Sequence, residues 1–293
     1  MSEQNYWVDA GNGIRLFAQT WGDKNNEALV LVHGYPDSHT VWEQIASKLA
    51  GKFYVIAYDV RGAGQSTIPT KIKDYRMELL AQDLAAVVDT VIPGRKFHLA
   101  AHDWGSIQTW ESVTTDRLKG RILSYTTLSG PCLDHAAFTL RKYANNPKVL
   151  AKLLSRSWYI FCFHMPVAAP LLWKTYLGKN WDAVVNRLEN AKDLPENPTQ
   201  TSDGVHGVNL YRANFIKKLA KPEQRFAHCP VQAVILEKDA FVSETYINDL
   251  PRWVKDLTIQ RLNANHWAVL SQPEVIAQFI ETFALKNAEK QAA

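Results

Sequence analysis

Short runs of apolar residues, most of them uninterrupted, recur along the chain, and each ends at a polar or glycine-rich loop. A strand that is apolar on both faces is typical of a parallel sheet covered by helices on each side. Helical patterns lie between these runs, and residues 6–22 predict a hairpin. The sequence therefore favours an α/β fold with a mostly parallel sheet of eight strands flanked by helices. The apolar runs lie at residues 28–32, 53–57, 97–101, 122–128, 231–236 and 257–262.

The region 132–225 interrupts this alternation. It contains helical stretches and polar loops but no convincing buried strand. We therefore expect a core formed by residues 1–131 and 226–293, with residues 132–225 inserted as a helical cap. A last helix is predicted for residues 273–285, and residues 287–293 are expected to form a frayed tail.

The segment Ala101-His102-Asp103-Trp104-Gly105 joins a predicted strand to a predicted helix. This setting, with a small residue two positions to either side of the centre, is typical of a nucleophile elbow, whose central residue is usually serine. Here the centre is Asp103, and a carboxylate is already ionised at neutral pH, so it can attack an alkyl carbon directly. The alternative is that Asp103 only caps the helix. We expect His102 to pack in the core or to orient the turn.

Two further residues follow later strands of the predicted sheet. Asp239 comes after the run 231–236, and His266 comes after the next run. The order nucleophile, acid, histidine is that of α/β-hydrolases, in which all three lie on loops at one edge of the sheet. We therefore expect Asp239 to orient His266 and His266 to activate water. Asp134, just beyond the run 122–128, is the alternative acid.

Two other loops follow strands near the start of the chain. His33-Gly34-Tyr35-Pro36 lies where half of an oxyanion hole is expected, so the backbone N–H groups of Tyr35 and Trp104 are predicted to converge on one oxygen. The glycine-rich segment 59–66 lacks both the lysine of a phosphate loop and the third glycine of a dinucleotide fingerprint. We interpret it as a structural turn.

Composition excludes several classes of function. The formal net charge is only +4 and the basic residues are scattered, which argues against nucleic-acid binding. The three cysteines are far apart, as expected for reduced thiols in a cytoplasmic protein. The first residues do not resemble a signal peptide, and no apolar stretch is long enough to span a membrane.

Three motifs carry a resemblance to a known family. They are His33-Gly34-Tyr35-Pro36, Asp59-x-Arg61-Gly62-x-Gly64-x-Ser66 and His102-Asp103-Trp104-Gly105. Together they resemble those of epoxide hydrolases of the α/β-hydrolase fold, over nearly the whole chain. The sequence looks most like the hydrolase half of bacterial two-domain proteins in which a short-chain dehydrogenase domain follows, although no second glycine-rich unit is present here. Ala101 stands where the elbow of the family often has glycine.

The resemblance implies a reaction that needs no cofactor and no metal. In this family two cap tyrosines donate hydrogen bonds to the epoxide oxygen, and the matching residues are Tyr159 and Tyr211, with Tyr143 and Tyr176 as further candidates. An epoxide oxygen leaves as a basic alkoxide and needs such donors, whereas a halide does not. We therefore expect conversion of a small apolar epoxide into a vicinal diol through an ester on Asp103.

Other interpretations stay open at this stage. Haloalkane dehalogenases share the Asp-Trp elbow, and release of free halide would identify one. A hydrolase of another strained electrophile, such as a lactone, would use the same three residues. A non-catalytic ligand-binding protein on this fold would be expected to lack one of Asp103, Asp239 or His266, and all three are present. The sequence leaves a homodimer open.

Overall fold

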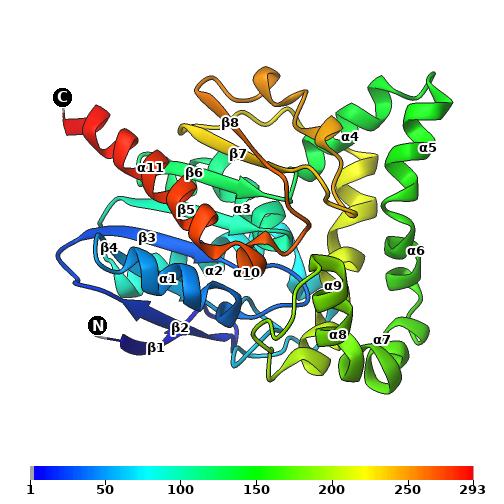
Figure 1. Ribbon diagram of the computed structural model, residues 1–293, viewed down its shortest axis with the longest axis horizontal. Coiled ribbons are helices and arrows are strands. Elements are labelled where there is room, and N and C mark those ends of the chain that lie inside the picture. Colours follow the sequence, from blue (N-terminus) through cyan, green and yellow to red (C-terminus); the bar gives the residue numbers. More distant parts are fainter. Residues whose placement is uncertain (1–2, 293) are drawn as a thin grey trace.

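One eight-stranded sheet forms the centre of the computed structural model, which describes residues 3–292 (Figure 1). The strand order is β1-β2-β4-β3-β5-β6-β7-β8; β2 is antiparallel to both of its neighbours, and the other pairs are parallel. The predicted sheet is therefore confirmed. The strands are β1 (Glu3–Asp9), β2 (Arg15–Trp21), β3 (Glu27–Val32), β4 (Phe53–Tyr58), β5 (Phe97–His102), β6 (Ile122–Leu128), β7 (Val231–Leu236) and β8 (Leu257–Leu262).

Helices cover both faces of the sheet because its central strands are buried on both sides. In β3, Val30 and Val32 face the side covered by α2 (Met77–Val91) and α3 (Trp104–Thr114). The alternate residues Leu29 and Leu31 face the side covered by α1 (Glu43–Leu49) and α11 (Pro273–Ala292), which pack against each other (Figure 1). The period of two along a strand thus divides the apolar residues between two cores.

Six further helices lie between β6 and β7, beyond the carboxyl ends of the parallel strands (Figure 1). No strand occurs anywhere in residues 132–225. The helices are α4 (Leu133–Lys142), α5 (Pro147–Ser155), α6 (Trp158–His164), α7 (Ala168–Leu172), α8 (Gly178–Glu189) and α9 (Gln200–Ala220), with a π-helical turn at Trp173–Leu177. We refer to residues 132–225 as the cap segment.

Tyr35 connects the cap segment to the loop after β3. Its hydroxyl donates to the carbonyl oxygen of Gly204 in α9 at 2.9 Å. A Cβ atom at Gly207, one turn further along α9, would lie 2.3 Å from the Tyr35 ring, so only glycine allows this close approach. The first turns of α9 are therefore fixed relative to the loop in which the oxyanion hole is expected.

The expectation of a frayed tail at residues 287–293 is wrong for the part of that tail that the structure describes. Helix α11 continues to Ala292, and Asn287 is buried and donates from Nδ2 to the carbonyl oxygen of Phe283 at 2.8 Å. The helix continues because the last residues are mostly good helix formers and because Ile280 and Ala284 pack on the core. Within residues 3–292, no helix combines the length and apolar character that a membrane crossing requires. A short helix, α10 (Ala268–Ser271), precedes α11.

Candidate active site

Asp103 occupies a strained turn between β5 and α3. Its φ is 50° and its ψ is −124°, values that a residue with a side chain adopts only when its surroundings enforce them. Three glycines leave the necessary room: a Cβ at Gly34 would lie 2.5 Å from Cβ of Asp103, and one at Gly130 would lie 2.2 Å from its carbonyl oxygen. A Cβ at Gly105 would lie 2.2 Å from the carbonyl oxygen of Val32. The geometry of a nucleophile elbow is therefore present. The sequence did not indicate that Gly34 and Gly130 make room for it.

His266 lies between Asp103 and Asp239. Its Nε2 is 3.5 Å from Oδ2 of Asp103, and its Nδ1 is 3.0 Å from Oδ2 of Asp239. The other oxygen of Asp239 accepts hydrogen bonds from the backbone N–H groups of Phe241 and Val242, at 2.7 and 3.0 Å. These bonds fix the carboxylate, and the carboxylate in turn fixes the imidazole ring. The loops after β5, β7 and β8 thus bring the three residues together.

Asp134 is engaged elsewhere. Its Oδ2 lies 2.9 Å from Nε of Arg225, and its Oδ1 accepts from the backbone N–H of Glu223 at 2.9 Å. Lys218 and Glu111 complete a buried group of four ionised side chains. Asp239, not Asp134, is therefore the acid in contact with His266.

The charges of the two carboxylates dominate the titration of His266. Burial alone would lower the pKa of the imidazole, but Asp239 and Asp103 outweigh burial and raise this pKa well above its usual value. Burial would likewise raise the pKa of Asp239, but the adjacent His266 lowers it. The imidazole therefore favours its protonated form while both carboxylates are charged.

Tyr35 donates its backbone N–H to Oδ1 of Asp103 at 2.7 Å. The two oxygens of Asp103 consequently have different partners, since Oδ2 faces His266. Trp104, the second residue expected to contribute an N–H group, is the first residue of α3, and its ring packs edge-on against Tyr211 at 4.8 Å. His102 is buried and its Nε2 bonds the carbonyl oxygen of His266 at 2.9 Å, so it helps to hold the histidine loop.

Tyr159 from α6 and Tyr211 from α9 lie on the cap side of Asp103. Their ring centroids are 6.1 Å apart in an edge-on arrangement. Burial and the charge of Asp103 raise the pKa of Tyr159, and burial and the phenols and carboxylate around it raise that of Tyr211. Both hydroxyls are therefore protonated donors at neutral pH. The alternative candidates Tyr143 and Tyr176 do not line the cavity that contains Asp103.

A cavity of about 130 Å³ connects these residues, and most of its lining is apolar. This volume accommodates an organic molecule rather than one or two waters. Tyr246 is a third tyrosine on its wall, and burial raises its pKa to about 12. Nothing in the sequence indicated Tyr246, which lies in a short turn without a motif. The other lining residues include Ile107, Leu133, Ala136, Leu140, Ile160, Phe161, Phe215, Leu219 and Phe241.

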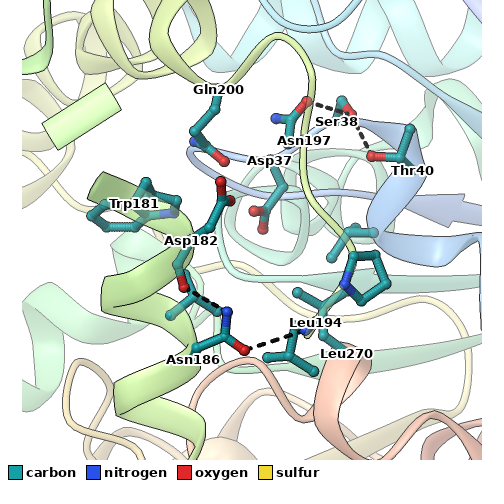
Figure 2. A pocket seen from close by; sticks show the side chains of 13 residues that line it. Asp37, Ser38, Thr40, Trp181, Asp182, Asn186, Leu194, Asn197, Gln200 and Leu270 are labelled. Carbon is teal, nitrogen blue, oxygen red and sulfur yellow. Dashed lines mark hydrogen bonds between the residues drawn. The ribbon is translucent and has the colours of Figure 1, made fainter. Parts of the chain in front are cut away.

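A second cavity, of about 20 Å³, lies between the loop that follows β3, helix α8 and the segment before α9 (Figure 2). It is lined by polar residues including Asp37, Asn197 and Gln200, and it has room for no more than a water or two. Asp37 is buried and accepts from Nε1 of Trp267 at 3.2 Å. Burial and the nearby charge of Asp103 raise the pKa of Asp37 to about 7.

Two residues of the cap segment hold the loops that carry Asp239 and His266. Arg156 donates from Nη1 to the carbonyl oxygens of Asp239 and Val242, at 2.9 and 3.1 Å. Glu189, at the end of α8, accepts from the backbone N–H of Trp267 and from Oγ of Ser271, both at 2.7 Å. Neither contact is indicated by the sequence, because each joins positions that are more than seventy residues apart.

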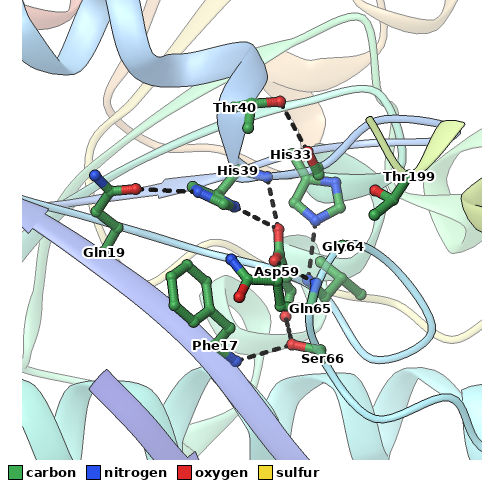
Figure 3. Close-up of polar contacts among 12 residues, drawn as sticks. Phe17, Gln19, His33, His39, Thr40, Asp59, Gly64, Gln65, Ser66 and Thr199 are labelled. Carbon is green, nitrogen blue, oxygen red and sulfur yellow. Dashed lines mark hydrogen bonds and ion pairs between the residues drawn. The ribbon is translucent and has the colours of Figure 1, made fainter. Parts of the chain in front are cut away.

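The glycine-rich segment 59–66 forms a turn whose N–H groups bind the protein's own carboxylates (Figure 3). Gln65 donates its N–H to Asp59 at 2.8 Å, and Gly64 donates to Asp203 at 2.9 Å. A Cβ atom at Gly64 would lie 2.1 Å from an oxygen of Asp59, which explains the glycine. His39 also bonds Asp59, through its ring and its backbone N–H. These contacts support a structural turn.

The alpha/beta hydrolase fold family matches residues 27–273 of the chain. The chain therefore belongs to this family, as the sequence motifs and the strand order predict.

Individual relatives and solved structures match most of the chain. The "Probable oxidoreductase EphD" of Mycobacterium tuberculosis is 32% identical over 292 residues, which cover 94% of this chain and 49% of that protein. The chain thus spans about half the length of that relative. "Epoxide hydrolase 3" of Xenopus tropicalis is 24% identical, covering 93% of this chain and 75% of its own. An epoxide hydrolase from Bacillus megaterium, solved with its product (R)-3-[1]naphthyloxy-propane-1,2-diol, superposes with a TM-score of 0.79 at 19% identity, over 96% of this chain and all of that one.

Proposed function

We propose that this protein is an epoxide hydrolase that converts an apolar epoxide into a vicinal diol through an ester on Asp103. The observation that carries the proposal is the shared cavity: the carboxylate of Asp103 and the phenols of Tyr159 and Tyr211, whose pKa values are raised, line it together with mostly apolar side chains. The names of "Epoxide hydrolase 3" and of the Bacillus megaterium structure agree with it, whereas the name of the mycobacterial relative is that of an oxidoreductase. In this proposal residues 1–131 and 226–293 are the hydrolase core and 132–225 the cap, acting in the cytoplasm.

In the first step Asp103 opens the ring. Its Oδ2 forms a bond to one epoxide carbon while the bond between that carbon and the ring oxygen breaks. Tyr159 and Tyr211 donate hydrogen bonds to the departing oxygen. One of the two phenols transfers its proton to this oxygen, which becomes a hydroxyl, and the phenolate regains a proton from solvent. Attack by a carboxylate fixed near the substrate avoids the entropic cost of bringing two free reactants together. The product of this step is an ester between Asp103 and the substrate.

In the second step water hydrolyses the ester. His266 removes a proton from water as the water oxygen attacks the carboxyl carbon of Asp103, and Asp239 stabilises the imidazolium. The carbonyl oxygen, held by the N–H of Tyr35, carries the negative charge that develops, and the N–H of Trp104 is the second donor. The acyl–oxygen bond then breaks, and the leaving alkoxide takes the proton from the imidazolium and departs as the diol. Asp103 loses its remaining proton to solvent and keeps one oxygen from water.

The same three residues would serve a dehalogenase, so the two cap tyrosines decide between the reactions. A halide leaves as a stable anion and gains little from a phenol that donates a proton. Two phenols whose pKa values are raised by burial remain protonated and suit an oxygen leaving group. Release of halide from haloalkanes, with no turnover of epoxides, would reverse the assignment.

A His266→Gln variant tests the covalent step. Loss of the base should leave ring opening intact and stop ester hydrolysis, so the ester accumulates. Intact-protein mass spectrometry after incubation with an aryl epoxide should show the mass of one substrate added, and peptide mapping should place it on Asp103. In the unmodified protein, one turnover in H2(18)O should leave the label in Asp103. An adduct on another residue, or full turnover by the variant, would contradict the mechanism.

A further inference from the structure

The cap segment carries a concentration of exposed apolar side chains. Eight of the fourteen large apolar side chains exposed in residues 3–292 fall between positions 154 and 176. They include Trp158, Phe161 and Val167, which are 65%, 72% and 72% exposed. An exposed apolar cluster of this kind marks a surface that binds something else. We call this cluster the cap face: Leu154, Trp158, Phe161, Met165, Val167, Leu171, Leu172 and Tyr176.

The cap face lies at the edge of the molecule. Leu154 lies on α5, Trp158 and Phe161 lie one turn apart on α6, and Met165 directly follows α6. The remaining residues follow on α7 and its flanks. Helices α5 and α6 stand at the side of the molecule opposite α11, away from the sheet (Figure 1). A flat partner can therefore reach them without contacting the core.

The charge of this region has one sign. Between Asp134 and Asp182 the sequence contains seven lysines and arginines and no aspartate or glutamate. Lys148, Lys152 and Lys174 are exposed, and in the described part of the chain none of them belongs to an ion pair. Basic side chains in the same helical segment as exposed tryptophan, phenylalanine and tyrosine are the composition by which a helical surface binds an anionic lipid layer.

The cavity opens towards the same surface. Leu154 and Phe161 belong both to the cap face and to the lining of the cavity that contains Asp103. A molecule that enters beside these two residues reaches Asp103 along an apolar wall.

We propose that the cap face docks on anionic lipid surfaces, so that the protein takes lipophilic epoxides directly from the lipid phase. The uptake of epoxides from the lipid phase rests on the proposed function, whereas the docking on lipid does not. A second copy of the chain is the other occupant to consider, but a twofold contact through this face would place the same basic region of each copy against the other. An anionic lipid surface complements both the charge and the apolar side chains.

Cosedimentation with vesicles tests the docking. Vesicles of phosphatidylcholine and phosphatidylglycerol should bind the protein, and vesicles of phosphatidylcholine alone should bind it at least about tenfold more weakly. A triple serine variant of the cap face and a triple charge reversal beside it should each reduce binding by at least about tenfold. The triple serine variant combines Trp158→Ser, Val167→Ser and Leu171→Ser. The triple charge reversal combines Lys148→Glu, Lys152→Glu and Lys174→Glu.

Matched controls replace exposed apolar or basic residues in other parts of the surface and should bind as the unmodified protein does. The serine control combines Trp7→Ser, Ile72→Ser and Ile259→Ser. The charge-reversal control combines Lys71→Glu, Lys73→Glu and Lys255→Glu. Circular dichroism and Tm verify that each variant is folded. Equal binding by the cap variants and the controls, or no binding by the unmodified protein, overturns the proposal. A dimer in light scattering that the cap variants convert to monomers, without vesicle binding, assigns the face to a second copy.

Substrate delivery is measured separately. The triple serine variant should hydrolyse a long-chain epoxide embedded in the anionic vesicles at least about tenfold more slowly, and styrene oxide in solution at the unmodified rate. Equal loss on both substrates overturns delivery from lipid. If neither substrate is turned over by the unmodified protein, the proposed function fails while the vesicle result still decides the docking.

Discussion

Nε2 of His266 lies 3.5 Å from Oδ2 of Asp103, at ion-pair distance, so the charge of the proposed nucleophile directly tunes the proposed base. While Asp103 is ionised, it and Asp239 hold the pKa of His266 above its usual value. An ester on Asp103 carries no charge. Its formation would remove one of the two charges that keep the imidazole protonated, so the neutral imidazole would become available in the step that needs a base.

Replacing Asp103 by asparagine imitates the uncharged ester and tests this coupling. The pKa of His266 should fall, by about one pH unit or more, because an opposite charge within a few ångströms is lost while Asp239 remains. The 15N chemical shifts of the imidazole, followed through a pH titration, measure the change. Asp116→Asn, an exposed aspartate far from the site, is the control and should leave the pKa unchanged. An unchanged pKa in the Asp103 variant would show that the two groups are not coupled.

The same coupling sets the pH dependence of ester hydrolysis. Only the neutral imidazole accepts a proton from water, so single-turnover hydrolysis of the ester should slow as the pH falls below the pKa of His266 in the ester state. That pKa should be lower than in the free protein, because the charge of Asp103 is gone. Stopped-flow fluorescence separates ester formation from hydrolysis. A midpoint at or above the free-protein pKa would contradict the argument.

Asp239→Asn and Asp134→Asn distinguish the two acids. Asp239 contacts Nδ1 of His266, so its loss should slow ester hydrolysis by about 10³-fold or more and let the ester accumulate. Asp134 pairs with Arg225 in a separate buried cluster, so its replacement should lower Tm while ester hydrolysis stays near the unmodified rate. Ester accumulation in the Asp134 variant alone would transfer the orienting role to that residue.

Removal of the phenol hydroxyls tests the ring-opening step. Tyr159→Phe and Tyr211→Phe should each slow ester formation, because one of two donors to the departing oxygen is lost. The double variant should retain almost no activity towards epoxides, since a lost proton donor costs about 10²-fold or more and paired donors are not additive. Tyr246→Phe, on the same cavity wall, is the matched control and should have a smaller effect. Ring opening by the double variant at the unmodified rate would refute the assignment.

Glu189 offers a test of how the cap segment positions His266. It holds the backbone N–H of Trp267, the residue next to the histidine, so Glu189→Ala should lower kcat by about 10- to 10²-fold with little change in KM. Glu189→Gln keeps an acceptor and should recover part of the loss. Glu196→Ala, an exposed residue of the same segment, is the control. An effect on KM alone would show that Glu189 does not position His266.

Features that depend on the local pattern of residues are predictable without the folded structure. Apolar runs such as 28–32 and 122–128 predict buried strands because a strand covered on both faces excludes polar residues. The elbow around Asp103 was visible because a strained turn needs small neighbours two positions away, and Asp239 and His266 were visible because each follows a strand end. Sheet topology then places such loops at one edge.

Contacts between residues that are distant in the sequence are visible only in the folded chain. Nothing near Arg156 or Glu189 in the sequence indicates that they hold the loops of Asp239 and His266, and nothing marks Tyr246 as part of the cavity wall. The sequence favours Asp239 as the partner of His266 but leaves Asp134 as an alternative, and in the folded chain only Asp239 of the two contacts His266. The local sequence pattern reflects what a strand or a turn requires of its residues. Contacts between positions more than seventy residues apart depend instead on how the finished elements pack together.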